Sequence, residues 1–168
     1  MAIKNIIILT LCMFISGTGA IVMVTLGGII GSDLSANPSL ATVPVSTMML
    51  SMAFTAIPAT MLMKKLGRRR GFSLASITAF LSALCSGLAL YLNNFEIFVI
   101  AGAIFGINMA FTQQYRYAAA ESVESEFAPK AISYVLLGAI GGAFLGPELV
   151  KYGENAIPSV QYLGTLIA

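Results

Sequence analysis

The spacing of the charged residues is the feature that most restricts how this sequence can fold. Charge is absent between Lys4 and Asp33, between Asp33 and Lys64, between Arg70 and Glu96, between Glu96 and Arg116, and between Lys130 and Glu148. Each gap holds about 17 to 30 residues, and about 20 apolar residues cross a bilayer as a helix. The sequence therefore predicts an all-α fold, a polytopic bundle of membrane helices.

The composition supports the same class. The chain is 58% hydrophobic and 10% charged, whereas soluble domains carry about 25% charged residues. A chain this apolar cannot cover its surface in water, so we expect the lipid bilayer to surround it. The net charge of +2 is too small to indicate a nucleic-acid partner.

The uncharged runs predict five complete transmembrane helices within a single transmembrane domain covering residues 1–168. The predicted spans lie near residues 5–30, 40–63, 72–92, 95–115 and 131–149. A sixth, partial span is expected at 157–168, where about eleven residues cover only about half of a ~30 Å core. We expect either that the sequence stops inside this helix or that the segment does not span.

The basic residues predict the orientation of the bundle. If the spans alternate, Lys4, the cluster from Lys64 to Arg70, Arg116 and Lys130 fall on one side, and only Lys151 falls on the other. Basic residues concentrate in cytoplasmic loops, so we expect a cytoplasmic N-terminus.

The sequence offers no set of residues for catalysis or metal binding. It has no His, and its two thiols, Cys12 and Cys85, lie inside predicted spans. It also lacks the Gly-rich loop that holds nucleotide phosphates. We therefore predict a protein that is not an enzyme and that holds neither a metal nor a cofactor.

The turn between the second and third spans contains a recognisable motif. The segment Thr60-Met-Leu-Met-Lys64-Lys65-Leu66-Gly67-Arg68-Arg69 resembles the signature loop of the major facilitator superfamily, Gly-x-x-x-Asp-Arg-x-Gly-Arg-Arg. Gly67, Arg68 and Arg69 match, and Lys65 keeps the positive charge of the expected Arg. Lys64 stands where the family has an Asp that helps to latch its two halves together. Gly67 is expected to take the positive φ that a tight turn after a helix often needs.

The fifth span carries a second, partial resemblance to the same superfamily. Gly142-x-x-x-Gly146-Pro147 matches the first half of a Gly-x-x-x-Gly-Pro-x-x-Gly-Gly motif found in its antiporters. Two interpretations remain open. The glycines can form a ridge that lets a neighbouring helix approach closely, or they can have a role related to coupling.

Together the two motifs indicate the N-terminal, six-helix half of a major facilitator superfamily transporter. This resemblance implies transport of a small solute by alternating access, and a second half supplied by a dimer partner, a separate chain or a missing C-terminal part. It also implies an integral membrane protein, which we expect in a bacterial inner membrane. The alternative is a non-transporting, facilitator-like scaffold or assembly subunit of a larger membrane complex.

The fourth span holds the candidate contacts to a solute. At 100° per residue, Asn108, Thr112, Tyr115 and Arg116 share one face, opposite the small residues Gly102, Gly106 and Ala110 together with Gln113. A polar face is costly in lipid and should face protein or a water-filled cavity. The resemblance implies that the first and fourth helices line such a cavity, and Gln113 is a further candidate.

Two questions about the fourth span stay open in the sequence. Arg116 is either a cation at the membrane interface or a cavity group that attracts an anionic substrate or pairs with a gating carboxylate. The run from Gln113 to Glu121 contains good helix formers, so we expect the helix to continue past the membrane surface.

Overall fold

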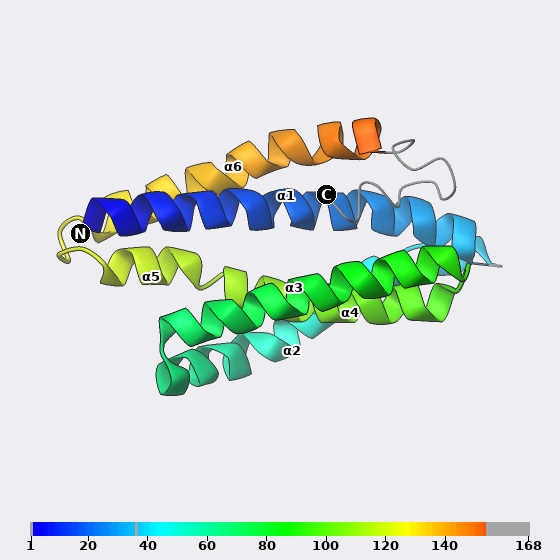
Figure 1. Cartoon of the computed structure of the whole chain (residues 1–168), viewed down its shortest axis with the longest axis horizontal. Helices are drawn as coiled ribbons and strands as arrows, with labels where there is room; N and C mark the ends of the chain where they lie inside the picture. Colours follow the sequence, from blue (N-terminus) through cyan, green and yellow to red (C-terminus); the bar gives the residue numbers. More distant parts are fainter. Residues whose placement is uncertain (1, 36, 154–168) are drawn as a thin grey trace.

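The computed structural model describes residues 2–35 and 37–153, and within these ranges it contains helices and connecting turns but no strand (Figure 1). The helices are α1 (Ala2–Leu34), the 3-10 helix η1 (Pro38–Leu40), α2 (Val43–Leu66), α3 (Arg68–Tyr91), α4 (Phe95–Thr112), α5 (Tyr115–Glu121) and α6 (Ala128–Gly153). The partial span expected at 157–168 lies outside the described residues.

Five stretches are long and apolar enough to cross a membrane, which confirms the predicted all-α membrane bundle. They are α1, α2, α3, the segment that combines α4 with α5, and α6. Large apolar side chains point outward from them, among them Phe54, Phe80 and Phe144, which are 79%, 65% and 78% exposed. In a soluble protein such a surface would be a liability, but lipid is its natural solvent.

The bundle consists of two closely packed groups of helices. In Figure 1, α1 and α6 run side by side in the upper part of the view, and α2, α3 and α4 form the lower part. Within the lower group, both α2 and α3 pack against α4. The two groups meet through the more limited contacts of α1 with α4 and α2, and α5 packs against both α1 and α6.

Small residues allow these close approaches. A Cβ atom added to Gly142 of α6 would lie 2.6 Å from the carbonyl oxygen of Phe14 on α1. A Cβ atom added to Gly102 of α4 would lie 2.7 Å from the carbonyl oxygen of Pro44 on α2. Backbone-to-backbone contact of this kind is the usual function of glycine at helix interfaces in membranes.

A tight turn at Gly67 joins α2 to α3. Gly67 has φ of 84°, as expected from the sequence, and its N–H donates to the carbonyl oxygen of Met63 at 3.0 Å. The beginning of α1, the α2–α3 turn and the α5–α6 connection all lie at the left of Figure 1. We call this end, which carries Lys4, Lys64–Arg70 and Lys130, the basic end.

Candidate functional site

The segment after α4 departs from the expected continuous helix. α4 ends at Thr112 and α5 begins at Tyr115. Between them the N–H of Gln114 donates to the carbonyl oxygen of Phe111, three residues back, at 3.0 Å. This turn changes the angular relation between α4 and α5, so faces drawn at 100° per residue do not extend beyond Thr112.

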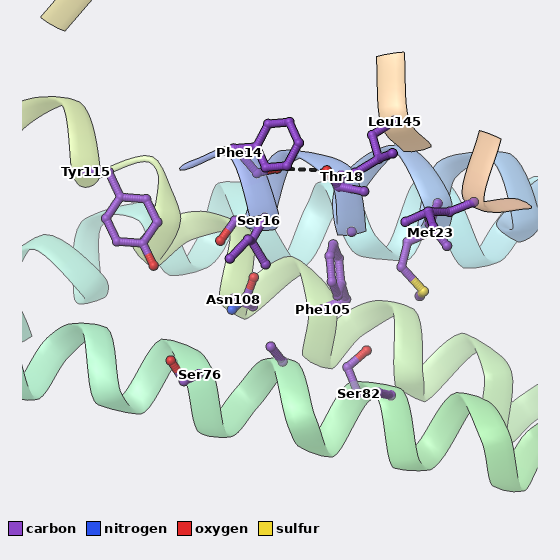
Figure 2. A pocket seen from close by; sticks show the side chains of 16 residues that line it. Phe14, Ser16, Thr18, Met23, Ser76, Ser82, Phe105, Asn108, Tyr115 and Leu145 are labelled. Atoms are coloured by element: carbon purple, nitrogen blue, oxygen red, sulfur yellow. Dashed lines mark hydrogen bonds between the residues drawn. The ribbon is translucent and has the colours of Figure 1, made fainter. Parts of the chain in front are cut away.

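A cavity of about 480 Å³, which we call the inner pocket, lies between α1, α3 and α4 (Figure 2). Tyr115 lies at one end of it, and Leu145 and Leu149 of α6 contribute to its wall. Its lining combines the aromatic rings of Phe14, Phe105 and Tyr115 with the polar groups of Ser16, Thr18, Ser76, Ser82 and Asn108. The pocket therefore offers flat apolar surfaces beside several hydrogen-bonding groups.

Asn108 uses part of its polar side chain to hold two helices together. The side chain is 5% exposed, and its Nδ2 donates to the carbonyl oxygen of Ala75 on α3 at 2.7 Å. In the opposite direction, the hydroxyl of Ser82 on α3 donates to the carbonyl oxygen of Ala101 on α4 at 2.8 Å. Thr112 is also buried, and its hydroxyl donates to the carbonyl oxygen of Met109 at 3.0 Å within its own helix.

A second cavity of about 710 Å³, which we call the end pocket, lies between α2 and the α4–α5 junction near the basic end. Its polar lining consists of Thr60 and Lys64 from α2 together with Gln113, Gln114 and Arg116. The guanidinium carbon of Arg116 lies 5.3 Å from the centre of the Tyr117 ring. The end pocket is therefore cationic.

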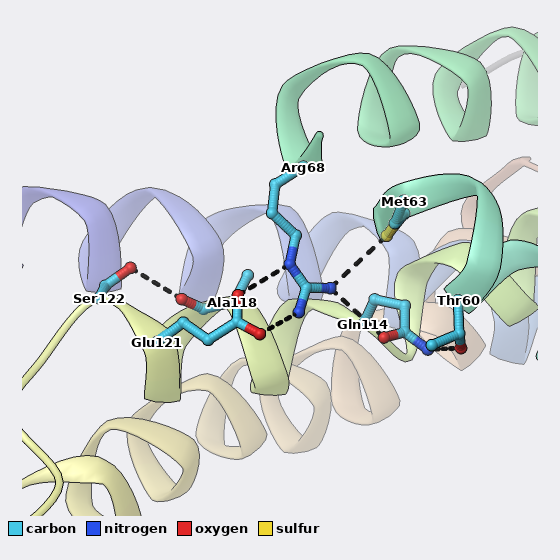
Figure 3. Close-up of polar contacts among 7 residues, drawn as sticks. All are labelled: Thr60, Met63, Arg68, Gln114, Ala118, Glu121 and Ser122. Atoms are coloured by element: carbon cyan, nitrogen blue, oxygen red, sulfur yellow. Dashed lines mark hydrogen bonds and ion pairs between the residues drawn. The ribbon is translucent and has the colours of Figure 1, made fainter. Parts of the chain in front are cut away.

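A group of polar contacts, which we call the end cluster, joins α3, α5 and α2 beside this pocket (Figure 3). Arg68 at the start of α3 forms a two-point ion pair with Glu121 at the end of α5, with Nε 3.0 Å from Oε2. Its Nη1 also donates to Oε1 of Gln114 at 3.4 Å, and Nε2 of Gln114 donates to the hydroxyl of Thr60 at 3.0 Å. Lys65 and Arg69 of the same motif are exposed.

The glycine ridge of the fifth span contacts α1 along its length. Gly138, Gly142 and Gly146 are buried against Thr10, Phe14 and Ile21 respectively. Pro147 lies inside α6, which continues to Gly153. The helix-packing interpretation of Gly142 and Gly146 therefore has a physical basis in the structure.

The predicted solute-contacting residues do not share one surface. Asn108 and Tyr115 line the inner pocket, Gln113 and Arg116 line the end pocket, and Thr112 belongs to the lining of neither. The turn at 113–114 interrupts the helix between Asn108 and Arg116, so the two side chains line different pockets. Gln113 and Arg116, placed on opposite faces from the sequence, line the same pocket.

Sequence reasoning missed the partner of Arg68. The motif drew attention to Arg68, but Glu121 lies 53 residues further along the chain. Glu121 is one of three acids in the same connection, with Glu124 and Glu126, and nothing in the sequence specifies which of them pairs with Arg68. Phe14 and Phe105 were also missed, because aromatic residues are common everywhere in this sequence.

Comparison with known proteins decides the family. A sequence model described as "Major Facilitator Superfamily" matches residues 7–152. The chain belongs to the Major Facilitator Superfamily. The match covers all five membrane-spanning stretches almost entirely, so the resemblance inferred from the Gly67 turn and the Gly142 ridge is confirmed.

Three superfamily relatives give a more detailed comparison. The riboflavin transporter RfnT of Brucella anthropi is 29% identical over 165 residues, which is 98% of this chain and 42% of that protein. The uncharacterized MFS-type transporters YddS and YdeG of Bacillus subtilis are 26% and 25% identical, over 91% and 88% of this chain and 35% and 34% of their own lengths. No solved structure matches the chain significantly.

The chain thus spans less than half the length of these superfamily relatives. The family match and the five membrane-spanning stretches make this chain part of an integral membrane protein. Arg68 belongs both to the Gly67-Arg68-Arg69 match and to the end cluster. The end cluster therefore connects the motif turn to α5.

Proposed function

We propose that this chain is the N-terminal half of a transporter that moves a small solute across a bacterial inner membrane by alternating access. The observation that carries the proposal is the superfamily match over residues 7–152, which coincides with a bundle of membrane-spanning helices. The greater length of the relatives supports a second half that completes the solute pathway.

The inner pocket is the proposed binding site for the solute. A volume of about 480 Å³ falls within the range of about 300–1,000 Å³ that is usual for small-molecule sites. The rings of Phe105 and Tyr115 could stack on a flat solute, and the Oδ1 atom of Asn108 retains the capacity to accept a hydrogen bond. The similarity to a riboflavin transporter makes riboflavin the first solute to test.

The signature loop is proposed to act as a gate at the basic end. Arg68 connects the beginning of α3 to α5 through Glu121, so the turn is linked to the α4–α5 segment. Lys64 is exposed beside this connection. Since Lys64 replaces the latch Asp of the superfamily, its contact in a second half should be a carboxylate or a carbonyl and not a donor group.

Uptake of riboflavin tests the proposal. A riboflavin-requiring bacterium that lacks its own uptake system expresses this chain, alone and together with the remaining half of the Brucella anthropi relative. We expect uptake only when both halves are present. We also expect Phe105→Ala to reduce the apparent affinity about fivefold, because stacking on an aromatic ring contributes about 1 kcal/mol. Phe80→Ala is the matched control, since Phe80 is 65% exposed toward lipid.

Two outcomes would contradict parts of this proposal. Failure of uptake with any second half, together with stable capture in a larger membrane complex, would favour the scaffold alternative. If Phe105→Ala lowers the melting temperature but leaves uptake unchanged, Phe105 serves only packing and the solute binds outside the inner pocket.

A further inference from the structure

The end pocket concentrates positive charge without a lining acid. Lys64 and Arg116 both line it, and none of the described residues that form its wall is an Asp or Glu. The remainder of the wall is uncharged, with the apolar side chains of Met52, Ile57 and Met61 on the α2 side. Two cations beside apolar surface attract an anion more strongly than they would in open water, because the local dielectric constant is lower.

Arg116 has a buried donor that is not satisfied by the protein. Its Nε atom is buried and has no hydrogen-bond partner within residues 2–35 and 37–153. A buried, unpaired donor destabilises the folded chain and calls for an explanation in a native structure. Stacking on Tyr117 orients the guanidinium but does not replace a hydrogen-bond acceptor.

The acid of the neighbouring end cluster, Glu121, is already engaged by another cation, Arg68. Glu121 accepts two hydrogen bonds from Arg68, and Gln114 links Arg68 to Thr60. These contacts account for the polar atoms of the end cluster without involving Arg116. Gln113, which also lines the pocket, forms no side-chain hydrogen bond with the described residues.

We propose that the end pocket binds an anionic oxygen group, a carboxylate or a phosphate, between Lys64 of α2 and Arg116 of α5. The planar guanidinium suits two-point contact with such a group, and the ammonium of Lys64 adds a second charge. Gln113 supplies a neutral donor at the same wall. The source is either a free solute anion or the headgroup of an anionic lipid, which share this chemistry.

This site goes beyond the transport proposal, because anion binding is measured on the purified chain without transport and needs no second half. The purified chain is placed in nanodiscs of neutral phosphatidylcholine, and unfolding is followed with a thiol-reactive dye on Cys12 and Cys85, both partly buried. Midpoints are compared in phosphate, citrate and chloride at equal ionic strength. A parallel arm replaces part of the lipid with phosphatidylglycerol and omits phosphate and citrate.

We expect phosphate or citrate to raise the melting midpoint, and the apparent affinity to fall about tenfold in Arg116→Gln and in Lys64→Gln, as loss of one charge-assisted bond predicts. Lys65→Gln is the matched control, because Lys65 is the adjacent exposed cation and does not line the pocket. A rise only with phosphatidylglycerol, lost in the same two variants, would identify lipid as the source.

The proposal would be overturned by either of two results. One is an unchanged midpoint in every anion and in the anionic lipid. The other is an equal loss of the shift in Lys65→Gln, which would show that the basic turn as a whole, and not the pocket, attracts the anion. Riboflavin uptake can fail while anion binding holds, so the two proposals fail separately.

Discussion

At the scale of single residues, Arg68 illustrates how a motif residue obtains its role from tertiary contacts. Its guanidinium bridges Glu121 and Gln114, and it lies 3.7 Å from the sulfur of Met63. The side chains of the ion pair are 32% and 62% exposed. Solvent therefore weakens the ion pair. Its contribution to the stability of the chain is that of a surface ion pair with favourable two-point geometry.

This arrangement predicts a modest but specific coupling. Glu121→Gln should destabilise the chain by about 1 kcal/mol, and a double-mutant cycle with Arg68→Gln should give a coupling energy of similar size. Melting curves in nanodiscs measure both quantities.

Glu124→Gln provides the control for the loss of one negative charge. Glu124 is exposed and forms no ion pair within the described part of the chain. Additive effects of Arg68→Gln and Glu121→Gln would show that the contact contributes nothing measurable.

At the scale of helices, glycine spacing decides which elements pack together. Gly138, Gly142 and Gly146 recur every four residues, so they form one ridge along α6, and that ridge meets α1. Gly102 and Gly106 do the same for α4 against α2. For Gly138, Gly142, Gly102 and Gly106 the nearest neighbour is a backbone oxygen, which cannot move aside as a flexible side chain can, whereas Gly146 packs against the Ile21 side chain.

Alanine substitutions at Gly142 and at Gly28 should therefore affect the stability of the chain in different ways. A Cβ atom at Gly142 would lie 2.6 Å from the oxygen of Phe14 and 2.7 Å from the nitrogen of Thr18. Gly142→Ala should destabilise by about 1–3 kcal/mol through overpacking. A Cβ atom at Gly28 meets nothing within 4 Å, so Gly28→Ala should be neutral or stabilise by up to about 1 kcal/mol through helix propensity.

The measurement is again the melting midpoint in nanodiscs, with the two variants compared side by side. A tolerated Gly142→Ala would mean that α1 and α6 are packed less tightly than in this structure. Such a result would also weaken the packing interpretation of the Gly142–Pro147 motif.

At the scale of the whole molecule, the alternating helices bring most of the basic residues to one end. Lys4, the α2–α3 turn and Lys130 all lie at that end, although they are distant in the sequence. The positive-inside rule links this end to the cytoplasm, because translocation of Lys and Arg is disfavoured. The orientation is a prediction from the loops and not a property of the bundle itself.

Fluorescent-protein fusions measure this orientation. A green fluorescent protein joined before Met1 should fluoresce in bacterial cells, because it folds into its fluorescent form in the cytoplasm. The predicted orientation depends on the basic turn, so replacing Lys64, Lys65 and Arg68–Arg70 by Gln should reduce the fluorescent fraction. Unchanged fluorescence in this variant would show that other loops set the orientation.

The sequence by itself determined the class of fold. The uncharged runs fixed the number of long helices, since a helix is the only economical way for such a run to satisfy its backbone in lipid. The Gly67 turn and its position after the second span indicated the family, and the positive φ of Gly67 follows from local chemistry alone. These features are local, so they could be read from neighbouring residues.

Only the tertiary structure decided which polar residues meet. The short turn at Gln113–Gln114 separates Arg116 from Asn108 and places Arg116 in the same pocket as Lys64. The partnership of Arg68 with Glu121 likewise depends on where two helix ends meet. Such contacts follow from packing angles and from one irregular turn. Neither can be predicted from helix periodicity in the sequence.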